Sequence, residues 1–204
     1  SVNFAAQGNA LNITNTPNAI INWQGFSIAP NEVTRFIQQN GSSNVLNRVV
    51  GLESSAILGA LQSNGRVYLI NPNGILFGPN ARVDVNGLIA STLDINNQDF
   101  LAGKYKFNAG ALAGKVDNQG AITTPSGGQI ILIAPDVQNS GILTSPQGEI
   151  LLAAGKSVHL VDSASPDLAV VVSAPENRAL NLGQIIANSG KIGIYGALVN
   201  QRGT

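Results

Sequence analysis

A phrase that starts with glycine and continues with alternating apolar positions recurs in the second half of the chain. It reads Gly-x-Ile-x-Leu-x-Ala or a close variant and occupies residues 128–134, 148–154 and 190–196. The starting glycines are 20 and then 42 residues apart, and a second glycine precedes each of them by 7 or 8 residues. Short apolar segments punctuated by glycine about every 20 residues are typical of a solenoid.

Within each phrase the second, fourth and sixth positions after the glycine are apolar or small, which predicts strands with one face directed into a core. These inward positions are Ile130, Leu132, Ala134, Ile150, Leu152, Ala154, Ile192, Ile194 and Gly196. Coils stacked about 4.8 Å apart would align them into aliphatic ladders, with backbone hydrogen bonds between coils. The pattern therefore predicts an all-β fold, a parallel β-helix with coils of about 20 residues. The 42-residue step is either two coils or one coil with an excursion near residues 163–178.

The upstream part of the chain predicts further strands and a different beginning. Strands are expected at 66–70, 81–85 and 88–90, separated by Asn-Gly turns at 64–65, 73–74 and 86–87. Residues 1–50 hold the only tryptophan, three of the six phenylalanines and little of the repeat. Because an open solenoid end exposes strand edges and an apolar cross-section, we expect residues 1–50 to form an N-terminal cap. Residues 51–204 then form the coils, and 1–204 is a single domain.

One helix is expected inside the cap. Over residues 31–40, the side chains of Val33, Phe36 and Ile37 would share one helical face.

Composition narrows the function. Hydrophobic residues make up 44% of the 204 residues and charged residues only 11%, far below the roughly 25% of ordinary soluble domains. With 11 basic and 11 acidic side chains, the formal net charge is zero. The basic excess of a nucleic-acid-binding or membrane-surface protein is therefore absent, and no nucleic-acid partner is expected.

Turn-forming residues take the place of charge. The chain contains 24 Asn, 23 Gly and 9 Pro, and neither Cys nor Met. A cysteine-free chain suits passage through an oxidising periplasm. No apolar run approaches the roughly 18 residues of a membrane-spanning helix. Ser1 does not open an apolar h-region, so we expect any signal peptide to have been removed or to lie outside this sequence.

The stretch Asn71-Pro72-Asn73-Gly74-Ile75, continuing through Gly87 to residues 90–95 (Ala-Ser-Thr-Leu-Asp-Ile), carries a family resemblance. It resembles the two-partner secretion (TPS) domain of filamentous haemagglutinin-like exoproteins, and among them the high-molecular-weight adhesins most. Further matches in the same order are residues 19–23 (Ala-Ile-Ile-Asn-Trp), Asn47-Arg48-Val49, residues 174–177 (Ala-Pro-Glu-Asn) and residues 181–183 (Asn-Leu-Gly). The likeness spans nearly the whole chain.

The resemblance implies a right-handed parallel β-helix with an N-terminal β cap and extra-helical strands or hairpins. It also implies a role as the secretion signal of a large bacterial surface or secreted protein. The implied partner is a dedicated outer-membrane β-barrel transporter with periplasmic POTRA domains, which receives the chain unfolded. The implied location is the cell surface or medium, reached through the periplasm. Whether the full protein is an adhesin, a cytolysin, a haem-acquisition protein or a contact-dependent toxin stays open.

The candidate recognition or folding motif consists of Asn71, Pro72, Asn73 and Gly74, together with Asn47 and Arg48. In a turn, Pro72 fixes φ near −65°, Gly74 takes positive φ freely, and the asparagine side chains can bond nearby backbone. These residues either form a well-made corner or contact the transporter. The two roles overlap, because a folding corner can also matter to export.

Catalytic and metal sites find little support. His159 is the only histidine, and a metal site would need further His, Cys or clustered carboxylates. In a strand, Ser157 and His159 share a face while Asp162 points to the other, so a triad is excluded and His159 is expected to be an exposed strand residue. Asp117 and Asp136 might face each other on adjacent coils as a carboxylate pair.

We therefore expect no catalytic residue, metal, cofactor or small-molecule substrate, and a monomer that is not an enzyme. The competing hypothesis is a carbohydrate-active β-helix of the pectate lyase type, because fold alone does not settle function. A stacked face rich in Asp, Arg and Lys would favour that alternative.

Overall fold

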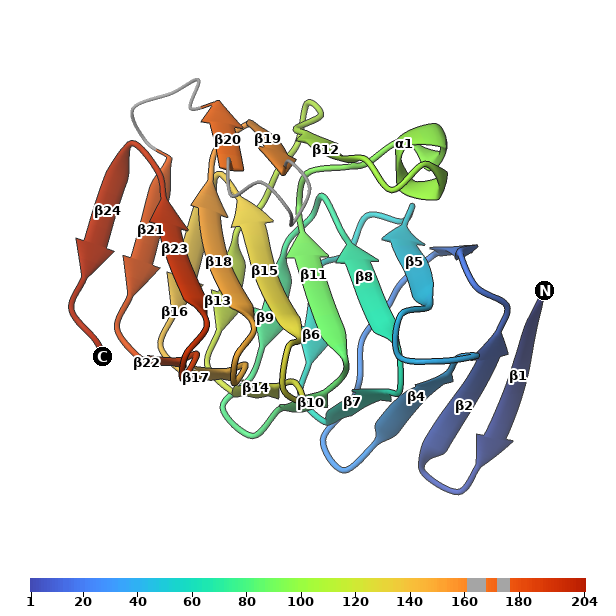
Figure 1. Cartoon of the computed structure of the whole chain (residues 1–204). Coiled ribbons are helices and arrows are strands. Elements are labelled where there is room, and N and C mark those ends of the chain that lie inside the picture. Colours follow the sequence, from blue (N-terminus) through green and yellow to red (C-terminus); the bar gives the residue numbers. More distant parts are fainter. Residues whose placement is uncertain (161–167, 172–176) are drawn as a thin grey trace.

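The computed structural model describes residues 1–160, the backbone of 168–171, and residues 177–204 (Figure 1). In this part of the chain, regular structure consists of 24 strands and one short helix, α1 (Asn97–Leu101). Among the described residues, none forms a helix with the length and apolar character that a membrane crossing requires.

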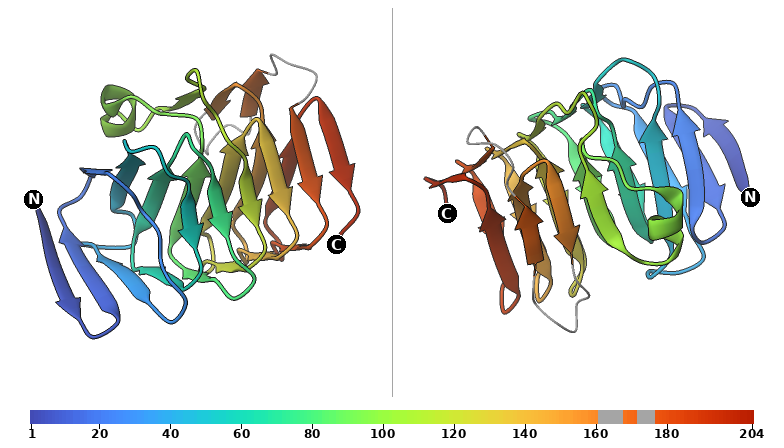
Figure 2. Two further views of the ribbon diagram at one scale, coloured as in Figure 1. Left: turned by 180° about the vertical axis from the view of Figure 1, so that it is seen from behind. Right: turned by 90° about the horizontal axis from the view of Figure 1, so that it is seen from above.

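Three sheets run along the length of the molecule, side by side around a common axis (Figures 1 and 2). Sheet A contains, in spatial order, β1 (Val2–Gln7), β2 (Ala10–Asn15), β4 (Val33–Ile37), β7 (Ala60–Ser63), β10 (Arg82–Asp84), β14 (Ala121–Thr123), β17 (Ile142–Thr144) and β22 (Gln184–Ile186). Sheet B contains β3 (Ala19–Trp23), β5 (Asn44–Val49), β8 (Arg66–Ile70), β11 (Gly87–Ser91), β15 (Gln129–Ala134), β18 (Glu149–Ala154) and β23 (Lys191–Tyr195). Sheet C contains β6 (Ser55–Ile57), β9 (Ile75–Phe77), β13 (Val116–Asn118), β16 (Asp136–Asn139), β21 (Arg178–Asn181) and β24 (Leu198–Gln201).

Successive coils pass through sheets A, B and C in turn, and each strand pairs in parallel with its counterpart in the next coil. Gln129 pairs with Glu149, which confirms the coil length of about 20 residues. Glu149 then pairs with Lys191, so the 42-residue step is one coil with an excursion. Of the excursion expected at 163–178, residues 163–167 and 172–176 lie outside the described residues, and Arg178 already begins β21. The parallel β-helix predicted from the glycine phrases is confirmed.

The predicted ladder of isoleucines is present in the register of sheet B. Ile130 pairs with Ile150, and Ile150 pairs with Ile192. Ile130 and Ile150 are fully buried in the core that runs along the axis of the coils. Ile192 is 51% exposed because β23 is the edge strand of its sheet.

A second layer covers the outer face of sheet B. It consists of α1 and a small antiparallel sheet of β12 (Tyr105–Asn108), β19 (Ser157–Leu160) and β20 (Leu168–Val171). Outward residues of sheet B such as Tyr68, Ile131 and Leu151 are buried in a cluster with Phe100 and Phe107. Burial raises the pKa of Tyr68 far above its ordinary value, and the adjacent Tyr105 adds to the shift. Sheet B therefore has an apolar environment on both faces, which explains why its strands are apolar at consecutive positions.

The excursion that carries α1 and β12 interrupts one coil between β11 and β13. Sequence analysis missed it, although the glycine phrase is absent between residues 91 and 120. Asn96 caps α1, because its side chain accepts a hydrogen bond from the backbone N–H of Asp99.

The helix expected at residues 31–40 is wrong. Residues 33–37 form β4, which pairs in parallel with β2 and β7. Thr34 and Phe36 are buried and alternate with more exposed neighbours, so the apolar positions follow a period of two rather than of a helical turn. Tertiary pairing decided the conformation of a segment whose apolar residues fit either pattern.

The N-terminal end of the β-helix is covered by an antiparallel hairpin of β1 and β2, which forms the β cap. Parallel pairing begins directly after it, since β2 pairs with β4 and β3 pairs with β5. Phe4, Trp23, Phe26 and Phe36 form a chain of aromatic contacts at this end.

A ladder of buried asparagines lines the interior of sheet C. Asn118, Asn139 and Asn181 occupy one column and are fully buried. The Nδ2 atom of Asn118 donates to Oδ1 of Asn139, and Nδ2 of Asn139 donates to Oδ1 of Asn181, each at 2.8 Å. The sequence signal is an Asn-x-Gly triplet in each coil, which sequence reasoning read only as a corner.

Candidate functional site

The Asn-Pro-Asn-Gly segment, residues 71–74, forms the corner between β8 of sheet B and β9 of sheet C. The backbone N–H of Gly74 donates to the carbonyl of Asn71 at 3.1 Å, which closes a β-turn with Pro72 and Asn73 at its centre. Gly74 has a φ of +122°, a region that favours glycine. The predicted turn and the positive φ are both present, and we call residues 71–74 the NPNG corner.

Asn71 holds the corner against the preceding coil. Its side chain is fully buried, and its Nδ2 atom donates to the carbonyl of Glu53 at 3.0 Å and to Oγ of Ser55 at 2.9 Å. Its Oδ1 atom accepts from the backbone N–H of Asn73 at 3.0 Å, which is the expected Asx-turn. Both donor hydrogens and the acceptor are therefore engaged inside the protein.

Asn73 extends the same network. Its Nδ2 atom donates to the carbonyl of Gly51 and to Oδ1 of Asn71, both at 2.9 Å. On the other side, the following coil contacts the corner through the backbone, since Gly114 N–H donates to Pro72 O at 2.8 Å. The NPNG corner thus connects the turns of three successive coils.

Asn47 lies inside the β-helix, one coil before the corner. It pairs with Leu69 of β8 and is fully buried. Its Oδ1 atom accepts from the indole Nε1 of Trp23 at 2.9 Å, and its Nδ2 atom donates to the carbonyl of Tyr68 at 3.2 Å. Asn47 therefore ties the aromatic N-terminal end to the strand that leads into the corner.

Arg48 points to the opposite face, where it holds the α1 excursion. Its Nε atom lies 2.9 Å from Oδ1 of Asp94, and a terminal nitrogen donates to Oδ1 of Asn97 at 2.9 Å. The second terminal nitrogen donates to the carbonyl of Ile95. Its side chain is only 15% exposed, so Arg48 acts as a clamp between sheet B and the second layer.

The six candidate residues thus lie close together but serve different environments. Arg48 pairs with Ile70, the residue that precedes the corner. The backbone brings the two motifs to one end of neighbouring strands, while their side chains divide between interior, corner and outer face. Sequence reasoning missed Asp94 and Asn97 as partners, because no local spacing connects them to Arg48.

The alternative chemical groupings do not form a site. Asp117 and Asp136 lie on neighbouring strands but two positions out of register, so they do not face each other as a pair. Asp136 instead pairs with Arg178, whose terminal nitrogen lies 3.1 Å from its Oδ2. Within the described residues, no group of three His, Cys, Asp or Glu residues could hold a metal ion.

The lone histidine has a local partner only. Oγ of Ser157 lies 3.4 Å from Nε2 of His159, on the same face as expected, and Asp162 lies outside the described residues. His159 is half-buried in the small outer sheet rather than fully exposed as we predicted.

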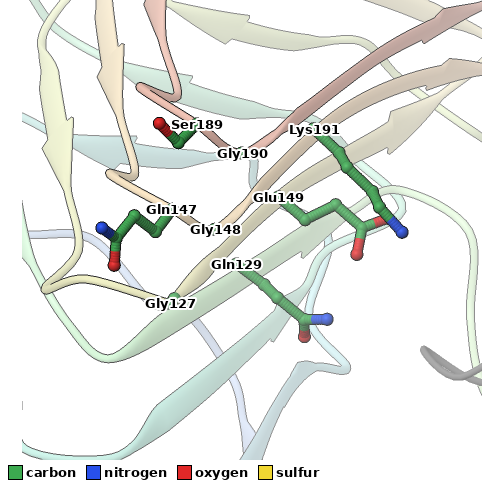
Figure 3. Close-up of a pocket in the computed structure, with 9 residues that line it drawn as sticks. Gly127, Gln129, Gln147, Gly148, Glu149, Ser189, Gly190 and Lys191 are labelled. Carbon is green, nitrogen blue, oxygen red and sulfur yellow. The ribbon is translucent and has the colours of Figure 1, made fainter.

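A shallow trough of about 250 Å³ lies where three coils turn from sheet A into sheet B (Figure 3). Gln129, Glu149 and Lys191 stand in register along it, and Gly148 and Gly190 lie beside them (Figure 3). A Cβ atom on Gly148 or Gly190 would overlap a carbonyl of the coil beneath, so the glycines are needed for stacking. Close coil stacking explains the trough without a ligand.

Comparisons with known proteins identify the family. The family model described as TPS secretion domain matches residues 2–203. Two heme/hemopexin-binding proteins of Haemophilus influenzae are 40% and 38% identical to the chain over 94 and 89 residues, which is 46% and 44% of this chain. The chain covers 10% of each, about a tenth of the length of these curated relatives.

A solved structure agrees over almost the whole chain. The crystal structure of the HMW1 secretion domain from Haemophilus influenzae covers 98% of this chain with a TM-score of 0.93 and 40% sequence identity. The chain covers 55% of that solved chain. The pectate lyase alternative is therefore wrong, because the same coils match a secretion module along their whole length. The chain belongs to the family of TPS secretion domains, the export modules of adhesins such as HMW1 and related exoproteins.

Proposed function

We propose that the chain is received in an extended state by a cognate outer-membrane β-barrel transporter with periplasmic POTRA domains, and that it folds after leaving the barrel. A TPS secretion domain implies a transporter partner and export. The POTRA contact and the state in which the chain is recognised are our proposal.

The observation that carries the proposal is the burial of the NPNG corner. In the folded domain, both side-chain hydrogens of Asn71 and its carbonyl oxygen are bonded to neighbouring segments, and its side chain is fully buried. A partner that read this side chain would have to do so before the coils stack. Asn47 leads to the same inference, because it is fully buried and bonded to Trp23 and Tyr68.

Extended segments of this chain suit capture by strand addition. Backbone hydrogen bonds to a sheet edge supply affinity, and alternate side chains supply specificity. The strands of sheet B are apolar on both faces once the second layer is counted, so in an unfolded chain they would favour a partner that covers them. We propose these strands, together with residues 47–48 and 71–74, as the segments that the transporter reads.

The larger protein is proposed to be exported through the periplasm to the cell surface or the medium. The relatives named above are heme/hemopexin-binding proteins, and the solved neighbour is the secretion domain of HMW1. We propose an adhesin or haemagglutinin-like protein as the whole. The domain itself is proposed to have no enzymatic activity and no metal dependence, so a chelator should leave its melting temperature unchanged.

The export experiment uses the variant Asn71→Ala with Asn73→Ala on the chain fused to a passenger, in cells that make the partner barrel. We expect secretion to fall sharply, because the variant can neither present the motif nor close the corner. Asn80→Ala is the matched control, since Asn80 is an exposed asparagine in a neighbouring proline-containing turn. Secretion of the double variant at the wild-type level would refute a role for the motif.

Refolding of the purified double variant separates the two roles. If it refolds with wild-type stability but is not secreted, the motif is a recognition element. If it does not refold, loss of the corner explains the loss of export. Transport of a passenger in cells without the barrel would contradict the dependence on a transporter.

A further inference from the structure

The outer edge of β1 is the feature that the secretion function leaves unexplained. β1 is the end strand of sheet A and pairs only with β2 among the described residues. Its register with β2 is uninterrupted from Val2 to Gln7, so it contains no bulge. Residues 2–7 contain no proline and no charged side chain, and the first charged side chain of the whole sequence is Glu32. Proteins normally protect such an edge with lysine, proline, bulges or a covering loop.

The hydrogen-bond phase of the hairpin shows which groups are free. The carbonyl of Ser1 accepts from the N–H of Thr16 at 3.0 Å, so these two residues form a closely bonded pair. In an antiparallel ladder such pairs alternate with pairs whose backbone groups point away. The N–H and C=O groups of Val2, Phe4 and Ala6 therefore point outward from the edge.

An apolar surface adjoins this edge. Phe4 is 50% exposed, and its ring packs edge-on against Trp23 with a centroid distance of 5.7 Å. Trp23 in turn contacts the buried Phe26 at 5.3 Å. The most exposed ring of the aromatic chain thus lies on the central residue of the free strand.

From these observations we infer that β1 pairs antiparallel with β1 of a second copy of this chain, about a two-fold axis at Phe4. The outward groups allow Val2 to pair with Ala6 of the second copy, Phe4 with Phe4, and Ala6 with Val2. Each of these three pairs exchanges two backbone hydrogen bonds, so six form in all. This register gives the largest overlap of the two strands, and it is self-complementary, as a two-fold interface requires.

The side chains support the same register. Directly opposite aromatic residues stabilise antiparallel pairs, and here the two Phe4 rings would meet beside the two Trp23 rings. Because residues 1–31 carry no charged side chain, no like charges oppose each other across the axis. The pairing would join two copies of sheet A into one continuous sheet. It adds an associated state to the monomer expected from the sequence.

The absence of cysteine makes a disulfide test direct. Phe4→Cys should form an intermolecular disulfide under mild oxidation, because opposite residues in such a pair have Cα atoms about 5.5 Å apart, within the disulfide range. Ala6→Cys alone is the matched control. Its two copies would be separated by four residues along the strand, about 14 Å, and should not cross-link.

A mixture of Val2→Cys and Ala6→Cys tests the register with Phe4 intact. We expect heterodisulfides between the two variants, each in excess over its own homodisulfide. Equal cross-linking of Phe4→Cys and Ala6→Cys would indicate random collision and overturn the inference. Cross-linking of Ala6→Cys with itself in preference to Val2→Cys would overturn it as well.

Sedimentation equilibrium of the unmodified chain supplies an independent readout. Association should increase with concentration and be lost in Phe4→Lys, which places like charges on the two-fold axis. Val199→Lys, on the partly exposed β24 at the other end of the β-helix, should leave association unchanged. A monomer at all concentrations, or loss of association only in Val199→Lys, would refute pairing through β1.

Discussion

The side-chain nitrogen of Asn71 lies 2.9 Å from the hydroxyl oxygen of Ser55, and both residues are fully buried. The bond joins two successive coils at the NPNG corner, because Ser55 opens β6 and Asn71 follows β8. A buried polar group that loses its partner costs about 1–3 kcal/mol. The stability of this corner therefore depends on an asparagine that a motif search alone would assign to recognition.

The first prediction concerns that bond. Asn71→Ala should lower the free energy of unfolding by about 2–3 kcal/mol, since the hydroxyl of Ser55 and the carbonyl of Glu53 both lose a donor. Urea unfolding followed by Trp23 fluorescence should show a lower midpoint with an unchanged slope. The exposed control Asn80→Ala should change stability by less than about 0.5 kcal/mol. Equal effects of the two substitutions would contradict the structural role of Asn71.

The second prediction concerns the approach of the following coil. A Cβ atom on Gly114 would lie 2.8 Å from the carbonyl oxygen of Asn73 and 2.9 Å from the nitrogen of Gly74. Gly114→Ala should therefore destabilise the domain by about 1–3 kcal/mol through overpacking. Gly110→Ala is the matched control in the same loop, because a Cβ atom there meets nothing within 4 Å. Thermal unfolding of both variants should separate them, and a neutral Gly114→Ala would be inconsistent with close coil stacking at the corner.

The third prediction concerns the clamp formed by Arg48. Arg48→Ala removes three hydrogen bonds to residues 94–97, so the α1 excursion should open more often. Amide hydrogen exchange over residues 94–104 should accelerate about tenfold, equivalent to about 1.4 kcal/mol of local stability. Arg48→Lys should recover only part of the protection, because an ammonium group cannot reproduce the planar fork. Exchange in sheet A should stay unchanged.

Arg35→Ala provides the control for that measurement. Arg35 also bonds two side chains, those of Gln62 and Asn12, but it lies on the outer face of sheet A. Its loss should leave exchange over residues 94–104 unchanged. Faster exchange there in both variants would mean that general destabilisation, and not the clamp, governs the excursion.

Much of the β-helix could be predicted because its repeat is local. The glycine phrases at 128–134 and 148–154 set the coil length and the inward positions, and the strand register follows from stacking identical coils. The turn at residues 71–74 was predictable for the same reason, since Pro72 and Gly74 restrict the backbone within four residues.

The missed features depend on contacts between distant residues. Arg48 and Asp94 are 46 residues apart, and the outer sheet combines β12 and β19 from two separate excursions. The wrong helix at 31–40 has the same cause, because β4 is fixed by its neighbours β2 and β7. Each of these features requires knowing which coil lies next to which before the pattern can be interpreted.

The last prediction concerns alkaline stability. Tyr68 is buried beneath the second layer, and burial raises its pKa well above the value of about 10 of a free tyrosine. Above about pH 10 the unfolded chain therefore releases this proton while the folded domain retains it, so stability must fall as pH rises, by about 1.4 kcal/mol per pH unit for one such group. Tyr68→Phe keeps the ring packing against Phe100 but has no proton to lose. Urea unfolding between pH 9 and pH 11 should show a shallower decline for this variant, and identical slopes for the two proteins would show that Tyr68 ionises freely in the folded state.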